Sequence, residues 1–294
     1  MSDSGTDAFV EHRNLLFTVA YEMLGSAADA EDVVQETWLR WADVEESEVR
    51  DPRAYLVRIV TRLALNRLRT LSRRREEYVG EWLPEPLLTS PDVAEDVELA
   101  DSVSIAMLTV LETLTAYERA VFVLREVFDV PYDEIAESVG KSPAAVRQIA
   151  HRAREHVAAR RPRREVARSE QEQVVERFLA AVSNGDLQGL LDVLAPDVVL
   201  IADGGGVVVA ARVPLAGADV VSRFLSFFAR RAAPEGAVLA PAVLNGAPGA
   251  RVDIGGVLDT VVSVVVEDGL ISRIFVMRNP HKLAHARQET ELAR

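Results

Sequence analysis

The spacing of the hydrophobic residues changes once along this chain, near residue 168. Before it, apolar side chains such as Phe9, Leu16 and Met23 recur at the intervals of amphipathic helices. After it, short valine-rich runs such as the one at Thr260–Val266 alternate with helical stretches, which is typical of an α+β domain. At 294 residues the chain is long enough for two or three compact units. We therefore expect helical units followed by a domain that contains a sheet.

Composition places the chain among folded proteins, since 49% of its residues are hydrophobic and 27% are charged. It contains no cysteine, which excludes disulfides and thiolate metal sites. Its start lacks the basic residues and long apolar run of a signal peptide, and its apolar runs are far shorter than the roughly 20 residues of a membrane span. We expect a cytoplasmic protein that does not bind membranes.

Charge is distributed unevenly along the chain. The net charge of −13 argues against tight DNA binding by the isolated protein, since such binding depends on neutralising phosphates. However, residues 50–77 carry nine arginines and three acids, and residues 141–164 carry eight basic residues and one acid. Between them, residues 76–101 carry nine acids and no Lys or Arg. Charge runs are often only solvated helix faces, but two basic helical blocks joined by an acidic linker are a more specific indication of nucleic-acid binding.

Helices are expected throughout the first segment, residues 8–75. Ser26 and the acids after it favour a helix start, and Val34 and Trp41 share one side of that helix while the opposite side is acidic. The next helix is basic and amphipathic. Such a helix can also lie on a membrane surface or bind a partner, so by itself it does not decide the function.

The second helical segment has the layout of a helix-turn-helix. Pro131 opens a short helix, Gly140 supplies a turn, and Ser142 caps a second helix. The second helix exposes side chains suited to base edges and phosphates in the major groove, namely Arg147, Gln148, His151, Arg152 and Arg154. Ordinary helical hairpins share this outline, but the basic second helix favours DNA binding.

Together these segments resemble domains two and four of extracytoplasmic-function (ECF) sigma factors of bacterial RNA polymerase. The resemblance rests on DAEDVVQETWLRW at residues 29–41, PRAYLVRIVTRLALNRLR at residues 52–69 and YDEIAESVGKSPAAVRQIAHRARE at residues 132–155. It covers about residues 8–161. It implies an initiation factor that binds core RNA polymerase, through its β′ coiled coil and β flap, and promoter DNA. It implies no catalytic residue, cofactor or metal.

The resemblance also assigns roles to individual residues. Asp32, Gln35 and Glu36 would contact the β′ coiled coil, an acidic face meeting a basic partner, although they can also be read as merely exposed helix residues. The residues that would engage the melted minus-ten element are Arg58, Arg62, Asn66, Arg67 and Arg69. Those that would bind the minus-thirty-five element are Ser142, Arg147, Gln148, His151, Arg152 and Arg154.

The sequence does not decide the roles of two features of the first segment. Tyr55 either stacks on a base or belongs to the core, and its place among Leu and Ile favours the core. The loop Val44–Asp51 corresponds to the family's base-capturing loop, but its acids Glu45, Glu46 and Glu48 leave individual contacts unassigned.

The segment from residue 168 to residue 283 predicts an α+β domain, in which Asp268–Gly269 is a hairpin-turn signal. The phrase FLAAVSNGDLQGLLDVLAPDVVLIADGGG at residues 178–206 is similar to the SnoaL-like, NTF2-like fold, a curved sheet wrapped over helices around a pocket. By that resemblance the pocket could hold a small ligand.

Three phrases, WLPEPL, DGGG and NPHKL, resemble those of the ECF sigma factors with a SnoaL-like tail, the sigma factor J type. In that group the linker phrase and the tail pack together, so the tail can hold the DNA-binding domains compactly and replace a separate anti-sigma protein. The residues implied in this interdomain contact are Trp82, Pro84, Asp203, Gly204, Gly205, Gly206, Asn279, Pro280, Lys282 and Leu283. Val207 and His281 depart from the group's pattern.

The expected architecture is multidomain, with two all-α sigma domains, the second carrying the helix-turn-helix, and an α+β SnoaL/NTF2-like domain with a curved sheet. The expected boundaries are sigma domain 2 at residues 1–78, the acidic linker at 79–104, sigma domain 4 at 105–164, the SnoaL-like regulatory domain at 168–283 and a C-terminal tail at 284–294. We expect a monomer when the protein is free.

The sequence does not exclude two other functions. A helix-turn-helix regulator independent of polymerase leaves residues 29–41 unexplained. A SnoaL-type hydrolase or cyclase would use Asp203, Arg212, Arg251 and Asp253 in a pocket, where a carboxylate beside arginine can be tuned for acid–base chemistry. The enzyme interpretation leaves the N-terminal half unexplained.

Overall fold

The structure is a computed structural model that describes residues 3–45, 49–90, 93, 95–161 and 166–294. For residues 3–6 and 72–76 it describes the backbone alone. The described helices include none that combines the length and the apolar character needed to span a bilayer.

The first helical unit contains three helices, α1 (Asp3–Leu24), α2 (Ala27–Ala42) and α3 (Pro52–Glu76). Gly25 ends α1 in a left-handed conformation, and the Ser26 hydroxyl caps α2 by accepting from the Asp29 N–H. The side of α2 with Val34 and Trp41 is buried, as the sequence predicts.

The second helical unit runs from residue 105 to residue 161. Its elements are α6 (Ile105–Leu111), α7 (Ala116–Phe122), the π-helical turn η2 (Val123–Val127), α8 (Tyr132–Val139) and α9 (Pro143–Ala158). Helix α8 ends at Gly140, whose φ is 66°, and the Ser142 hydroxyl accepts from the Ala145 N–H at the start of α9. This is the predicted helix-turn-helix.

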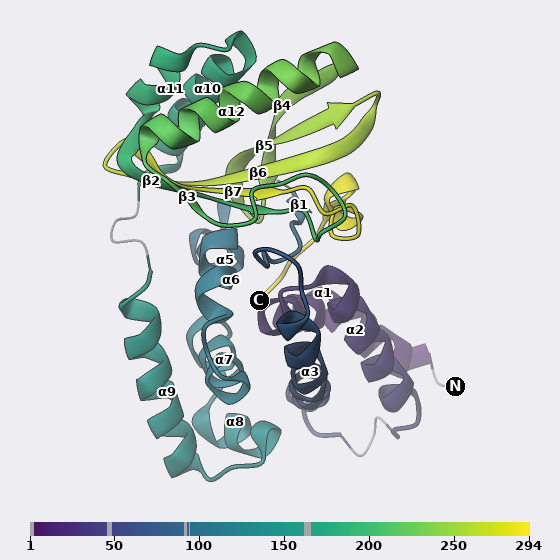
Figure 1. Cartoon of the computed structure of the whole chain (residues 1–294). Helices are drawn as coiled ribbons and strands as arrows, with labels where there is room; N and C mark the ends of the chain where they lie inside the picture. The colour runs from purple at the N-terminus through teal and green to yellow at the C-terminus, as the bar shows by residue number, and fades with distance from the viewer. Residues whose placement is uncertain (1–2, 46–48, 91–92, 94, 162–165) are drawn as a thin grey trace.

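The tail domain is an α+β domain whose sheet is covered on one face by helices (Figure 1). Its helices are α10 (Arg168–Asn184), α11 (Leu187–Val193), α12 (Ala218–Ala232) and the 3-10 turns η3 (Ala233–Glu235) and η4 (His285–Arg287). Its strands are β2 (Leu194–Asp203), β3 (Leu215–Ala216), β4 (Ala237–Leu244), β5 (Ala247–Ile254), β6 (Val257–Glu267), β7 (Leu270–Met277) and β8 (Glu289–Thr290). The predicted hairpin turn at Asp268–Gly269 joins β6 to β7.

The linker between the two helical units contributes to the sheet of the tail domain. It contains β1 (Leu88–Thr89) and α5 (Val97–Val103). The strand order is β3-β2-β7-β6-β5-β4-β1-β8, so the linker strand β1 lies between β4 and β8. The acidic linker is therefore a structural element of the sheet rather than a free tether.

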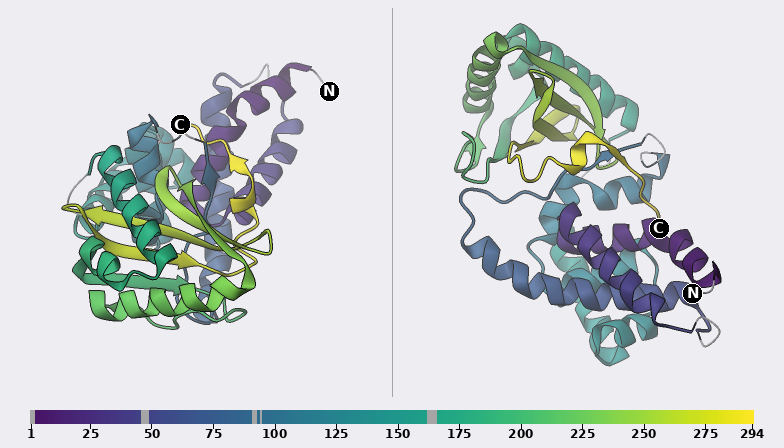
Figure 2. Two further views of the ribbon diagram at one scale, coloured as in Figure 1. Left: turned by 90° about the horizontal axis from the view of Figure 1, so that it is seen from above. Right: turned by 90° about the vertical axis from the view of Figure 1, so that its right-hand side faces the viewer.

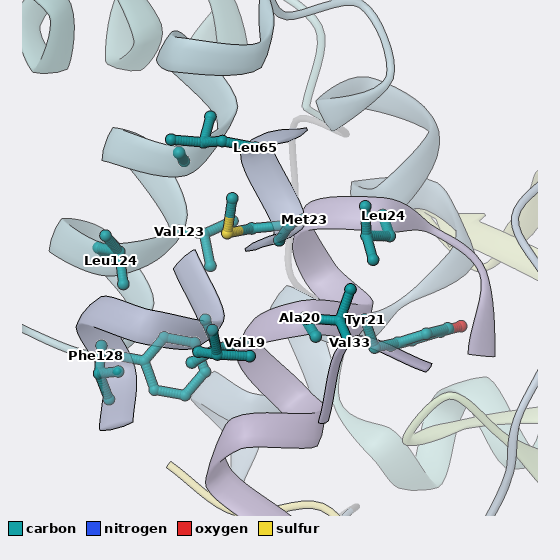
Figure 3. Packing of buried hydrophobic residues seen from close by; sticks show 14 of the residues in the cluster. Val19, Ala20, Tyr21, Met23, Leu24, Val33, Leu65, Val123, Leu124 and Phe128 are labelled. Atoms are coloured by element: carbon teal, nitrogen blue, oxygen red, sulfur yellow. The ribbon is translucent and has the colours of Figure 1, made fainter. Parts of the chain in front are cut away.

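The three parts pack against one another (Figure 2). One continuous apolar core contains residues of both helical units, and Figure 3 shows Val19 and Met23 of α1 near Val123 and Leu124 of η2. The sheet face opposite α10, α11 and α12 packs on the linker through a second cluster that includes Leu83 and Phe275. The predicted fold class, two helical units followed by an α+β domain, is confirmed.

Candidate interdomain and nucleic-acid interfaces

The acidic face of α2 is open to solvent. Asp32, Gln35 and Glu36 lie on this face and are all exposed. Asp32 accepts from Arg67 at 3.0 Å, and Glu36 accepts from Arg40 at 2.8 Å one turn along the helix. Exposed ion pairs of this kind bind weakly and exchange readily, so the face remains available to a basic partner.

The helix-turn-helix bonds to two arginines on the basic face of α3, while Arg62, Asn66 and Arg69 on that face remain exposed. Arg62 donates through Nη2 to the carbonyl of Glu137 at 2.8 Å and through Nε to the carbonyl of Ser138 at 3.3 Å. Arg58 donates to the Glu137 carboxylate at 3.1 Å. These carbonyls belong to the C-terminal turn of α8, where unpaired acceptors and the helix dipole attract cations. The sequence does not reveal this contact between the two candidate DNA-binding units.

The other candidate minus-ten residues lie further along α3. Arg67 is paired with Asp29 and Asp32, and Arg69 donates to Asn66 Oδ1 and to the Tyr117 hydroxyl of the second unit at 3.0 and 3.1 Å. The Asn66 side chain is exposed.

The Tyr55 ring is partly buried and packs against Trp41 with ring centroids 5.8 Å apart, while the Arg58 guanidinium lies 5.0 Å from its centroid. Tyr55 thus combines a core contact with a charged neighbour. Residues 46–48 of the loop Val44–Asp51, including Glu46 and Glu48, lie outside the described residues.

The candidate recognition helix α9 presents its polar face to solvent. Its six candidate residues are all exposed, namely Ser142, Arg147, Gln148, His151, Arg152 and Arg154. Arg154 donates to Glu126 and to the Tyr132 hydroxyl, so it is held by neighbouring side chains of its own unit.

Asp203 is the centre of a buried network between the tail domain and the chain that follows α3. Its side chain is completely buried at the end of β2. Its Oδ1 accepts from the Tyr78 hydroxyl at 2.5 Å and from the Gly205 N–H at 3.0 Å. Its Oδ2 accepts from the Leu83 N–H at 3.0 Å and from the Lys282 ammonium at 2.7 Å. Four donors satisfy this buried carboxylate, and burial together with the bond to Asp203 raises the pKa of Tyr78 well above its ordinary value.

Lys282 completes the network from the NPHKL phrase. Its side chain is buried, and its ammonium donates to the Leu83 carbonyl at 2.6 Å and lies 3.1 Å from the centroid of the Trp82 ring. A desolvated cation on an aromatic face adds a favourable term to the hydrogen bonds. Gly205 is required here because a side chain would place its Cβ 2.2 Å from the Asn279 amide nitrogen.

The other residues of the three phrases lie around this network. Asn279 donates to the Tyr78 hydroxyl at 2.8 Å, and Leu283 is buried in the cluster with Leu83. Pro84 and Gly204 are buried, whereas Gly206 and Pro280 are exposed. Of the two departures, the Val207 side chain is exposed, and the His281 backbone N–H donates to Asn279 Oδ1.

Glu85, inside WLPEPL, makes a contact with the start of α2 that the sequence did not predict. Its carboxylate accepts from the Ser26 hydroxyl at 2.8 Å and from the backbone N–H groups of Ala27 and Ala28 at 2.8 and 3.2 Å. The linker therefore supplies the acid that caps the N-terminus of α2, where the helix dipole favours negative charge. Burial raises the pKa of this carboxyl.

Asn245 is the second missed residue. Its buried amide accepts from the Leu87 N–H at 2.9 Å and donates to the Tyr21 hydroxyl at 2.7 Å and to the Val103 carbonyl at 2.9 Å. A single turn of the tail domain thus contacts the first helical unit and two separate parts of the linker. The only signal in the sequence was the turn dipeptide Asn245-Gly246, which indicates a hairpin and says nothing about its partners.

A second buried polar cluster joins α1, α5 and α7. Glu22 Oε1 accepts from the Ser102 hydroxyl at 2.8 Å, and the Glu22 carbonyl accepts from Arg119 Nε at 2.9 Å. Arg119 is buried and donates to Glu112 at 2.8 Å. Burial raises the pKa of the Glu22 carboxyl to about 8 and lowers the pKa of Arg119 to about 9.

The residues considered for catalysis do not meet in one pocket. Asp203 faces the linker, and Arg212 lines a cavity of about 250 Å³ between residues 79–80 and the DGGG turn. Arg251 and Asp253 form a two-bond ion pair along β5 at 2.7 and 2.8 Å, which lowers the pKa of Asp253.

Comparisons with known proteins agree with this arrangement. The family models Sigma-70 region 2 and Sigma-70, region 4 match residues 8–74 and 104–157. The ECF RNA polymerase sigma factor SigJ of Mycobacterium tuberculosis is 38% identical over 286 residues, covering 92% of this chain and 90% of the relative. The chain belongs to the ECF RNA polymerase sigma factors.

Other relatives of this ECF sigma factor support the same family over its whole length. A probable ECF sigma factor, SigI of M. tuberculosis, is 34% identical over 291 residues, which cover 98% of this chain and 97% of SigI. The crystal structure of M. tuberculosis SigJ matches with a TM-score of 0.78 and 36% identity, over 96% of this chain and 99% of that chain. The tail domain is therefore part of the matched architecture.

Proposed function

We propose that this ECF sigma factor directs promoter-specific initiation and that its tail domain controls it in cis, by holding the two helical units in a closed arrangement. The observation that carries the proposal is the buried Asp203 network, which joins the tail domain to residues 78–83 directly after the helix that carries the minus-ten candidates. In this arrangement the linker is bonded to the tail domain through Leu83 and to the first helical unit through Glu85. No separate anti-sigma protein is needed for closure.

In the closed form the α2 and α3 faces differ in whether their charged residues bond to another helical unit. The α2 face, with Asp32, Gln35 and Glu36, is open, and we propose that it binds the β′ coiled coil of core polymerase. On α3, Arg58 and Arg62 are engaged by hydrogen bonds to α8, while other residues of the face are exposed. Closure therefore competes with binding of the minus-ten element, whose phosphates and bases need the same arginines.

We assign the second helical unit to the minus-thirty-five element and to the β flap. Helix α9 would enter the major groove with Arg147, Gln148, His151 and Arg152 facing DNA, and Arg154 is held beside them. The division into units follows the boundaries given above, with the linker at residues 79–104 and the tail domain at 168–283.

We also propose that the tail domain has a regulatory rather than a catalytic role. Both oxygens of Asp203 are occupied by donors, and Asp253 is neutralised by Arg251, so neither carboxylate is poised as a general base.

A reversible crosslink tests control by the tail. Leu88 and Leu244 are antiparallel partners between the linker and the tail domain, and their Cα separation of about 4.5–5.5 Å suits a disulfide. Because the protein has no cysteine, Leu88→Cys/Leu244→Cys forms a single defined bridge. Run-off transcription with core polymerase should be low for the oxidised protein and recover on reduction, on a promoter selected in vitro with the reduced form.

The matched control places the bridge inside the tail domain. Ala237 and Ile254 are antiparallel partners of β4 and β5, away from the linker, so Ala237→Cys/Ile254→Cys should transcribe equally in both redox states. Equal output from the oxidised and reduced Leu88→Cys/Leu244→Cys protein would refute control by closure.

A further inference from the structure

The last six residues, 289–294, leave the tail domain and return to the first helical unit (Figure 1). We name them the terminal strap. The strap begins with β8, which pairs in parallel with β1 so that Leu88 lies opposite Glu289 and Thr89 opposite Thr290. A two-residue pairing is too short to be stable alone, so the strap depends on its other contacts.

The second set of contacts joins the strap to α1. The Ala293 backbone N–H donates to Thr18 Oγ1 at 3.1 Å, and Asn14 Nδ2 donates to the Glu291 carboxylate at 3.1 Å. Thr18 itself donates to the Asn14 carbonyl at 2.8 Å, so its hydroxyl is oriented to accept from the strap. These bonds connect residues more than 270 positions apart.

The third set of contacts joins the strap to α5. The Leu292 side chain is partly buried against both the core shared by the helical units and the small cluster of Val93, Leu99 and Val103. Arg294 pairs with Asp96 at 2.9 Å and with Glu98, next to the first turn of α5. The strap therefore touches the linker strand, the first helical unit and the linker helix at once.

This geometry makes the strap sensitive to closure. The strap can contact all three partners only while α1, β1 and α5 are held together, so its binding free energy is gained in the closed form and lost when the units separate. The bonds named above join the strap to Asn14, Thr18, Asp96 and Glu98, which lie outside the Asp203 network.

We infer that the surface formed jointly by α1, β1 and α5 is a binding site for an extended segment, and that residues 289–294 occupy it in cis as a latch that closes the sigma factor. This inference rests on the proposed control by closure and extends it to the helix α1. The surface selects an apolar side chain at the position of Leu292, flanked by an acid toward Asn14 and a cation toward Asp96.

The test uses the full chain with Leu292→Asp, a chain that ends at Gln288, and Arg294→Ala. The readout is amide hydrogen exchange in α1 and α5. Leu292→Asp and the shortened chain should each speed exchange at least about tenfold. The first loses the apolar contact of Leu292, and the second loses in addition the hydrogen bond from the Ala293 N–H to Thr18. Arg294→Ala should change it less than about threefold, because exposed ion pairs contribute little.

A synthetic peptide of residues 286–294 is then added to the shortened chain. It should slow the exchange of α1 and α5 back toward that of the full chain, whereas the same peptide with Leu292→Asp should not. The inference requires both results. Unchanged exchange in the Leu292→Asp chain, or failure of the peptide to restore protection, overturns it.

The experiment also separates the latch from the proposed function. If Asp203→Ala opens the protein while the strap variants stay closed, the latch is refuted and control by the tail domain stands. If neither change alters promoter output, control by closure itself is refuted.

Discussion

Replacing Asp203 by alanine should release the tail domain from the linker. The closed form loses two interdomain hydrogen bonds to a charged acceptor, from Tyr78 and from the Leu83 N–H. Bonds of this kind contribute about 1.5–3 kcal/mol each. The change also leaves the buried Lys282 ammonium without its carboxylate, and breaking a buried ion pair costs about 3–5 kcal/mol.

A shift of about 3–5 kcal/mol toward the open form raises the ratio of open to closed molecules at least about a hundredfold, at 1.4 kcal/mol per factor of ten. Energy transfer between dyes on Val10→Cys in α1 and Val238→Cys in β4 reports the separation of the first helical unit from the tail. Both valines are exposed, so the labels do not disturb the core. Promoter output in run-off transcription should rise together with the distance.

Asp253→Ala is the matched control for Asp203→Ala. It also removes a tail-domain carboxylate paired with a cation, but its partner Arg251 lies on the same strand and not in the linker. We expect no opening. The reasoning is refuted if Asp203→Ala keeps the distance and promoter output of the unmodified chain, or if Asp253→Ala opens the protein equally, which would show general unfolding of the tail.

Three further predictions concern separate contacts. Asp32→Ala/Glu36→Ala should weaken capture of core polymerase at least about tenfold in a pull-down, by removing two exposed charges of the face proposed to bind it. Tyr78→Phe should destabilise the closed form by about 1–3 kcal/mol in the energy-transfer assay, because Asp203 and Asn279 lose a buried partner. For Glu22, the raised pKa means that the closed form binds a proton more tightly than the open form. The closed form should therefore lose stability as the pH rises from about 5 toward 8, and Glu22→Gln should make this dependence shallower.

Each of these changes has a control in the same chain. Glu172→Ala/Glu176→Ala removes two exposed acids with the same helical spacing and should leave polymerase capture unchanged. Tyr132→Phe removes a hydroxyl that contacts Arg154 within the second unit, so it should not open the protein. Glu11→Gln changes an exposed acid of α1 and should keep the full pH dependence. Equal effects of a variant and its control would contradict the corresponding assignment.

Local patterns predicted the fold because they are set by neighbours in the chain. Ser26 and Ser142 were expected as helix caps, and Gly140 as a turn, and all three have these roles. The strands and the Asp268–Gly269 turn followed from alternation and turn chemistry. The resemblance also directed attention to Asp203 and Lys282, which are buried against each other and against the linker.

Long-range partners were not predictable in the same way. Helical spacing places Arg58 and Arg62 on an exposed face, but whether that face meets DNA or the carbonyls of α8 depends on how two units pack. Glu85 reads as one more acid of an acidic linker, yet it caps α2. Asn245 reads as a turn residue, yet it bonds three separate segments.

By itself the sequence determined the helices of the two units, the helix-turn-helix, the strands of the tail and the charge of each surface, since hydrophobic period, capping and turn residues act over a few positions. Only the tertiary structure decided which surfaces cover each other. Leu83 and Asp203 are 120 positions apart, and Ala293 and Thr18 are 275 apart. Such contacts arise from the shape and burial of complete units, so they exist only once the units have folded and packed together.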